Sequence, residues 1–152
     1  MTKKEIFEKI RIHPTKRTLI MLCGPPYSGK STLARRIAAL HPAKWVIISR
    51  EQNDFKRRLN ETLKINVSLI LDACHSTKKT REKIMALIPK GFWKIVIVIE
   101  VPLTTILARE RQDLPLILVS KQRAWEQFEG EKPDVEELRE LGFNQIFFLT
   151  EF

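Results

Sequence analysis

The sequence is poor in cysteine, in glycine and in long apolar runs. Its 152 residues include five glycines and two cysteines, Cys23 and Cys74. Both cysteines stand in apolar settings at predicted strand ends, which favours small buried residues over a disulfide framework and indicates a reducing compartment. The longest apolar stretch, from Ile95 to Val101, is interrupted by Glu100 and is too short to cross a bilayer. We therefore expect a soluble, cytoplasmic protein without a membrane partner.

Acidic residues are also under-represented. The 18 Asp and Glu residues face 27 Lys and Arg residues, so the formal net charge is +9. A charge of this size favours an acidic partner, with nucleic acid first among the candidates. A solvated basic surface would explain the same charge without any partner. Glu5 and Glu8, with no apolar run beside them, argue against a secretory signal or a transit peptide.

One motif dominates the chain. It fits the phosphate-loop pattern G-x-x-x-x-G-K-[ST] and consists of Gly24, Pro25, Pro26, Tyr27, Ser28, Gly29, Lys30, Ser31 and Thr32. Backbone N–H groups of such a loop, together with the positive end of the following helix, form a nest for phosphate oxygens. We expect Lys30 to reach the β and γ phosphates and Ser31 to offer its hydroxyl to Mg²⁺. The motif therefore predicts nucleotide binding.

The flanks of this motif supply the context that it requires. The run from Thr18 to Cys23 is short, apolar and typical of a strand, whereas apolar residues recur at helical spacing from Leu33 to Leu40. His41 and Pro42 then end the helix. A strand before the loop and a helix after it separate this match from a chance glycine-containing loop.

Two further strands deliver acidic residues at their carboxyl ends. The strand from Trp45 to Ser49 leads to Arg50 and Glu51, and the strand from Asn66 to Leu71 leads to Asp72. In open α/β sheets the ligand crevice lies at this edge, so Glu51 is a candidate catalytic residue. A helix-start acid, favoured by the helix dipole, is the alternative interpretation of Glu51. We expect Asp72 to support the Mg²⁺ shell.

Basic residues in two helices suggest contacts with an anionic substrate. Arg57 and Arg58 lie in a predicted helix from about Glu51 to Lys64, where a merely solvated face is the alternative. Pro102 opens a helix that carries Arg109 and Arg111 near its end. This is where a lid would sit, although basic residues also suit a helix carboxyl end.

The remaining pattern completes an α/β fold. We expect a short helix after Thr2, helices after Thr77, Pro115 and Pro133, and strands from Trp93 to Val101 and from Phe143 to Leu149. Five strands alternating with helices predict a parallel sheet with helices on both faces. The length fits one domain, residues 1–152, with residues 1–16 as an N-terminal helical extension that packs outside the sheet. His75, a lone histidine in a loop, is more typical of a bystander than of a catalytic base.

Together these residues resemble the small phosphate-loop kinases, and within them the kinase domain of polynucleotide 5′-hydroxyl kinases. The resemblance spans about residues 18–149 and is carried by Gly24 to Thr32, Ile48 to Glu51, Leu71 to Cys74 with Lys79, Arg81 and Glu82 after it, Val101 and Pro102, and Glu140 to Phe143. It implies a five-stranded sheet of order 2-3-1-4-5, ATP as phosphate donor, and an arginine from the lid, Arg109 or Arg111, over the transferring phosphate.

The sequence departs from that family at two positions. Glu51 stands where the family typically has Asp as general base, and Cys74 stands where it often has Asn. We expect γ-phosphoryl transfer to a nucleic-acid 5′-hydroxyl, with Glu51 as the base by analogy with the family's Asp, and with Arg50, Arg57 and Arg58 as substrate contacts. A kinase for a small metabolite or antibiotic and a non-catalytic nucleotide-dependent binding module remain alternatives, and the oligomeric state stays open.

Overall fold

The computed structural model describes residues 1–41, 43–49, 54–108 and 115–152, with the backbone alone for 115–119. The strands of this part of the chain are β1 (Thr18–Cys23), β2 (Trp45–Ser49), β3 (Ser68–Asp72), β4 (Trp93–Ile99) and β5 (Gln145–Leu149). The helices are α1 (Lys3–Lys9), α2 (Lys30–Leu40), α3 (Phe55–Leu63), α4 (Lys78–Ala86), α5 (Leu103–Ala108), α6 (Pro115–Glu131) and α7 (Val135–Glu140).

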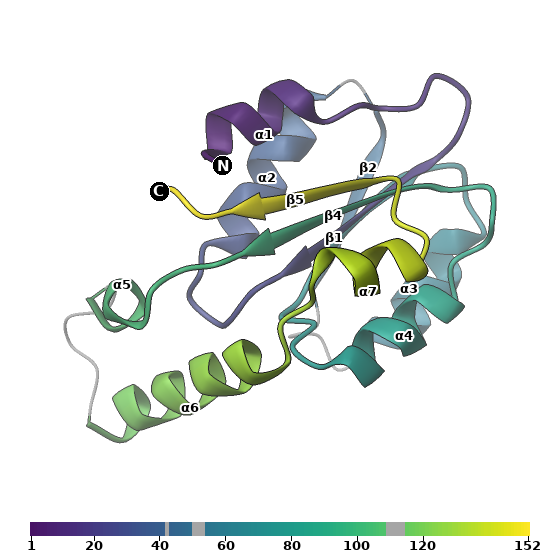
Figure 1. Cartoon of the computed structure of the whole chain (residues 1–152). Coiled ribbons are helices and arrows are strands. Elements are labelled where there is room, and N and C mark those ends of the chain that lie inside the picture. Colours follow the sequence, from purple (N-terminus) through teal and green to yellow (C-terminus); the bar gives the residue numbers. More distant parts are fainter. Residues whose placement is uncertain (42, 50–53, 109–114) are drawn as a thin grey trace.

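The five strands form one parallel sheet in the order β2-β3-β1-β4-β5 (Figure 1). This order confirms the fold that the sequence predicts. β1 is central, because it pairs with β3 in the register Leu22 to Asp72 and with β4 in the register Cys23 to Val98. The loop that follows β1 and the acid that ends β3 are thereby brought to the same edge of the sheet.

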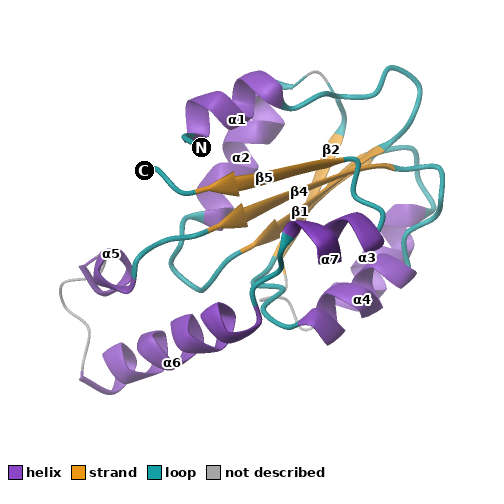
Figure 2. Ribbon diagram, viewed as in Figure 1, coloured by secondary structure: helices purple, strands orange, loops and turns teal. Residues whose placement is uncertain are grey.

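Helices cover both faces of the sheet, which gives three layers (Figure 2). The six residues of β1 are all buried and point alternately to the two faces, as expected of a parallel strand covered on both sides. Leu19 and Met21 pack with residues of α3, α4, α6 and α7, whereas Ile20 and Leu22 pack with residues of α1 and α2. Each face thus has its own apolar core.

α1 adds to the second of these cores. Thr2 and Glu5 form a capping box at its start, as the sequence predicts. Ile6 is fully buried and Ile10 nearly so, in the cluster that also holds apolar residues of α2. The N-terminal helix therefore packs onto the sheet face beside α2.

Some strand boundaries differ from those predicted. Phe143 is not the first residue of β5, because its N–H donates to the Leu138 carbonyl and so closes α7. Gly142 has a φ of 90°, which is the left-handed conformation that such a helix end requires. β3 likewise begins at Ser68 and not at Asn66, since the Val67 N–H donates to Ile65 in a turn.

β4 is the third strand whose predicted bounds need correction, because it ends at Ile99 and not at Val101.

No described helix is long and apolar enough to span a membrane.

Candidate active site

The loop between β1 and α2 is shaped by its glycines. Gly29 has a φ of 93° and Tyr27 a φ of 64°, so two residues of this short loop occupy the left-handed region. A Cβ on Gly24 would lie 3.0 Å from the Ser28 hydroxyl and 3.1 Å from the Ile99 side chain, which leaves no room for a larger residue. Pro25 and Pro26 have no N–H group. The amides that this loop could offer to an anion therefore come from residues 27–32.

Lys30 is buried within this loop. Its Nζ donates to the carbonyl oxygens of Gly24 (3.0 Å) and Pro25 (2.7 Å) and lies 3.4 Å from the Ser28 hydroxyl. Burial lowers the pKa of Lys30 below its ordinary value, while the neighbouring Cys74 and Asp72 side chains act in the opposite direction. The ammonium group is thus held by carbonyl oxygens of the loop itself, on a residue that lines the cavity described below.

Ser31 and Asp72 meet at the carboxyl edge of the sheet. The Ser31 hydroxyl donates to Asp72 Oδ2 over 2.7 Å. A hydroxyl and a carboxylate are hard oxygen ligands of the kind that Mg²⁺ prefers, and Mg²⁺ commonly takes only one or two ligands from the protein beside phosphates and water. These two side chains therefore fit a magnesium ion that is shared with a bound nucleotide.

A cavity of about 790 Å³ opens beside these groups. Its volume lies within the range that is usual for small-molecule sites. The phosphate loop contributes residues 26, 27 and 29–32, and the adjoining strand ends contribute Ser49 and Asp72. The remaining lining residues come from the loop after β3 and from α6: Ala73, Cys74, Ser76, Ala124 and Gln127. Sequence reasoning had not connected α6 with the nucleotide.

α6 also contacts the phosphate loop directly. The buried Lys121 places its Nζ 4.3 Å from the centre of the Tyr27 ring. A cation over an aromatic face is an attractive contact. Further along α6, the indole N–H of Trp125 donates to the Val101 carbonyl at 2.8 Å. The helix that follows the predicted lid is therefore attached both to the phosphate loop and to the chain after β4.

The loop after β3 is tied to the phosphate loop. The Gly24 N–H donates to the Cys74 carbonyl, and the ring Nδ1 of His75 lies 2.7 Å from the Leu22 carbonyl. His75 is buried, adopts a φ of 47° and is not among the residues that line the cavity. Cys23 is also buried, and burial raises the pKa of its thiol to about 12. It is a core residue without thiolate chemistry.

Other predicted site residues are placed only in part. Arg50, Glu51, Arg109 and Arg111 lie outside the described residues, so their predicted roles stay predictions. Arg57 is exposed on α3 and pairs with Asp54 at 2.6 Å. Arg58 is half-buried on the same helix. Neither of these two arginines is among the residues that line the cavity.

Solved structures share this architecture. A gluconokinase from Sinorhizobium meliloti 1021 superposes with a TM-score of 0.58 at 14% identity, over 90% of this chain and 85% of that chain. The chain has the phosphate-loop NTPase fold. A shikimate kinase from Acinetobacter baumannii, solved with shikimate, gives a TM-score of 0.54 at 17% identity over 97% of this chain and 88% of that one.

A Pnkp1/Rnl/Hen1 complex also contains a similar chain. The TM-score is 0.53 at 21% identity, over 70% of this chain and 43% of that chain. No protein-family model and no curated protein sequence matches this chain. The likeness to phosphate-loop kinases therefore lies in the fold.

Proposed function

We propose that this protein is an ATP-dependent phosphotransferase that transfers the γ-phosphoryl group to the 5′-hydroxyl of a nucleic acid. The observation that carries the first half of this proposal is the convergence of Lys30, Ser31 and Asp72 on one cavity. The phosphate-loop kinases of similar fold support the same reading.

The protein would act by position and charge. Lys30 and the amides of residues 27–32 would hold the β and γ phosphates, and Ser31 with Asp72 would hold Mg²⁺, which neutralises charge on those phosphates. Glu51 would accept the proton of the attacking hydroxyl, as the resemblance implies. Arg109 or Arg111 would neutralise charge that develops during transfer. None of these groups bonds covalently to the phosphoryl group.

The distribution of charge supports a polynucleotide acceptor. The net charge of +9 is uneven, because acidic residues outnumber basic ones between residues 126 and 140 and the positive excess lies on the rest of the chain. The first turns of α3 and α4 contain no acidic residue and instead carry basic ones, such as Lys56, Arg58 and Lys78. Positive charge at a helix N-terminus opposes the helix dipole, so helix stability does not account for it. Contact with a polyanion would account for it.

A metabolite kinase is the second candidate. It is favoured by the similarity to solved gluconokinase and shikimate kinase chains. In that case the basic first turns of α3 and α4 would be solvated, and the acceptor would fill the cavity together with the nucleotide.

One assay separates these possibilities. Labelled ATP is offered with a 5′-hydroxyl oligonucleotide, with a panel that includes gluconate and shikimate, and with no acceptor, for the wild type and for Lys30→Ala. We expect label on the oligonucleotide with wild type alone. Label on a small molecule would establish the second candidate, and nucleotide binding without transfer would indicate a nucleotide-dependent binding module.

A second assay tests the polynucleotide surface. Contacts with phosphates release counterions, so the affinity for the acceptor should fall steeply with added salt. Arg57→Glu/Arg58→Glu should raise KM for long oligonucleotides more than for short ones. Lys90→Glu, in the exposed turn before β4, is the matched control and should leave KM unchanged for both long and short oligonucleotides. If these α3 substitutions changed KM equally for long and short acceptors, this helix face would be merely solvated and would not contact the nucleic acid.

A further inference from the structure

Arg81 is a charged side chain with no exposed surface. It lies on α4, and its relative exposure is 0%. Burying a guanidinium is costly unless the charge is paired and its N–H groups are hydrogen-bonded. The mechanism proposed above has no use for Arg81, and it does not line the cavity. The partners of its guanidinium therefore indicate what Arg81 does in the fold.

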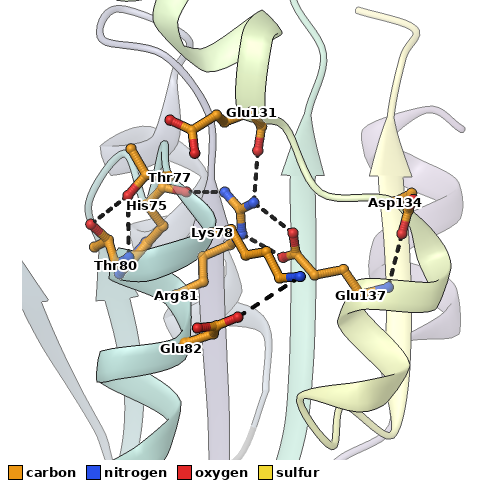
Figure 3. Close-up of polar contacts among 9 residues, drawn as sticks. All are labelled: His75, Thr77, Lys78, Thr80, Arg81, Glu82, Glu131, Asp134 and Glu137. Atoms are coloured by element: carbon orange, nitrogen blue, oxygen red, sulfur yellow. Dashed lines mark hydrogen bonds and ion pairs between the residues drawn. The ribbon is translucent and has the colours of Figure 1, made fainter.

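The charge of Arg81 is balanced by Glu137 of α7 (Figure 3). Nε donates to Glu137 Oε2 over 2.7 Å, and Nη2 donates to Oε1 over 2.9 Å. This is the two-pronged geometry that makes arginine–carboxylate pairs directional. Glu137 is itself fixed, because its backbone N–H donates to the Asp134 side chain, which caps α7.

The other two hydrogen bonds of Arg81 reach two of the segments that contribute residues to the cavity (Figure 3). Nη1 donates to the His75 carbonyl over 2.8 Å, within the loop that contributes Cys74 and Ser76 to the cavity. Nη2 donates to the carbonyl of Glu131, the last residue of α6, over 2.7 Å. One rigid guanidinium thus joins the loop after β3 to the carboxyl end of the helix that supplies Ala124 and Gln127.

The geometry points to Arg81 as a positioning residue for the nucleotide cavity: it fixes α6 relative to residues 73–76 and thereby sets how far apart these two walls stand. The inference rests on the proposed function only in that the cavity binds a nucleotide. α6 has 17 residues, so at 1.5 Å per residue it is about 26 Å long. A tilt of a few degrees at its anchored end displaces its first turn by about 1 to 2 Å.

Such a displacement is large on the scale of catalysis. Misplacement by about 1 Å can cost two orders of magnitude in rate. The first turn of α6 follows directly on the segment that carries Arg109 and Arg111. By this inference Arg81 acts on a bound nucleotide through the position of Ala124 and Gln127 on α6, without lining the cavity itself.

Positioning can be separated from stability because an apolar pair can replace a buried ion pair. Removing Arg81 alone leaves Glu137 without its partner and lowers stability, whereas exchanging both residues for apolar ones of similar size is often neutral or stabilising. We would compare Arg81→Met, Arg81→Lys and the double variant Arg81→Met/Glu137→Leu with wild type. Lys83→Met, an exposed neighbour on α4, is the matched control.

The measurements are the midpoint of thermal unfolding and the affinity for a fluorescent ATP analogue with Mg²⁺. Arg81→Met should lower both the unfolding midpoint and the affinity for the analogue. The double variant should recover the unfolding midpoint and still bind the analogue about tenfold more weakly than wild type, because the two carbonyl contacts remain broken. The affinity of Arg81→Lys should lie between those of wild type and Arg81→Met, since an ammonium group lacks the planar fork that spans both carbonyls. Affinity that recovers together with the unfolding midpoint in the double variant would overturn the inference.

A distance measurement decides the same point without nucleotide. Spin labels at Glu82→Cys on α4 and Gln122→Cys on α6, both exposed positions, are placed in a Cys74→Ser background. We expect one narrow distance distribution with Arg81 present and a broadened or shifted one in the double variant. Unchanged distributions would return Arg81 to a purely structural role. If wild type binds no nucleotide, the proposed function fails, and this measurement still decides the role of Arg81.

Discussion

The Ser31 hydroxyl donates a hydrogen bond to Asp72 Oδ2 at 2.7 Å, although the two residues come from different elements. Ser31 lies in the first turn of α2, and Asp72 ends β3. They meet because β1 and β3 are neighbours in the sheet, in the register that sets Leu22 beside Asp72. The sheet order therefore assembles the two oxygen ligands that the proposed magnesium site requires.

Loss of either oxygen should weaken Mg²⁺ binding. For Ser31→Ala and Asp72→Asn we expect the Mg²⁺ concentration that gives half-maximal transfer to rise by about 10- to 100-fold. A Mg²⁺ titration of the initial rate at saturating ATP measures this concentration. Ser76→Ala removes another hydroxyl from the same cavity and should leave it unchanged. The same Mg²⁺ requirement in all variants would contradict the assignment.

Nucleotide binding should take up a proton at alkaline pH. The pKa of Lys30 is lowered by burial, so this lysine loses its proton at a lower pH than an ordinary lysine. Phosphate groups favour the charged form and raise that pKa again on binding. Between the two values the bound state holds more protons, so nucleotide affinity should fall as pH rises above the pKa of the free protein.

Calorimetry in buffers of different ionisation enthalpy measures this uptake, at about pH 9, below the ordinary lysine value. Lys30→Arg is the control, because arginine stays charged throughout this range and its complex should form without proton uptake. An equal uptake in the Lys30→Arg protein would assign the proton to another group.

Glu51 is the predicted general base. Glu51→Gln should retain nucleotide affinity and lower the single-turnover rate by about a hundredfold or more, since the amide is similar in shape but a very poor base. Glu51→Asp should do less harm. Rapid-quench measurement of phosphorylated acceptor gives the rate, and Glu61→Gln, an exposed acid on α3, controls for loss of negative charge. A near-normal rate for Glu51→Gln would leave Glu51 as a helix-start acid.

Arg17 should contribute to stability alone. Its guanidinium donates to the carbonyls of Thr62, Leu63 and Val67 and stacks 4.4 Å from the centre of the Phe92 ring, so it closes the carboxyl end of α3. Because several hydrogen bonds from a charged donor are lost together, Arg17→Met should lower the free energy of unfolding by about 2 to 4 kcal/mol. Denaturant unfolding measures the change, with the exposed Lys16→Met as control. If Arg17→Met lowered the free energy of unfolding no more than the control does, Arg17 would not stabilise the carboxyl end of α3.

The phosphate loop and the sheet could be predicted because their signals are local. Gly24, Lys30 and Ser31 stand at fixed spacing between a strand and a helix that the neighbouring residues specify. The acid at the end of β3 follows a β-type run that is uninterrupted apart from Ser68, so its place at the sheet edge could also be predicted.

The wall formed by α6 could not be predicted, because it depends on contacts between distant segments. Arg81 is one of the residues that carry the resemblance, but nothing in the sequence shows that it is buried and paired with Glu137. Glu137 lies in the first turn of α7, where the helix dipole favours an acidic residue. Its presence there is thus explained locally, and the sequence does not indicate a partner in a distant segment. The apolar character of Phe143 predicts a strand residue, whereas the left-handed Gly142 makes Phe143 part of a helix end.

The central position of β1 has a consequence for folding. The strand is synthesised before both of its hydrogen-bonded neighbours, β3 and β4, which follow later in the chain. Pairing between distant segments is slow, because the entropy of loop closure is lost before contacts form. A nascent chain that ends before β4 leaves one edge of an apolar strand without its partner and exposed to aggregation. Ribosome-bound chains that end before residue 93 should therefore depend more on chaperones than chains that end after residue 99.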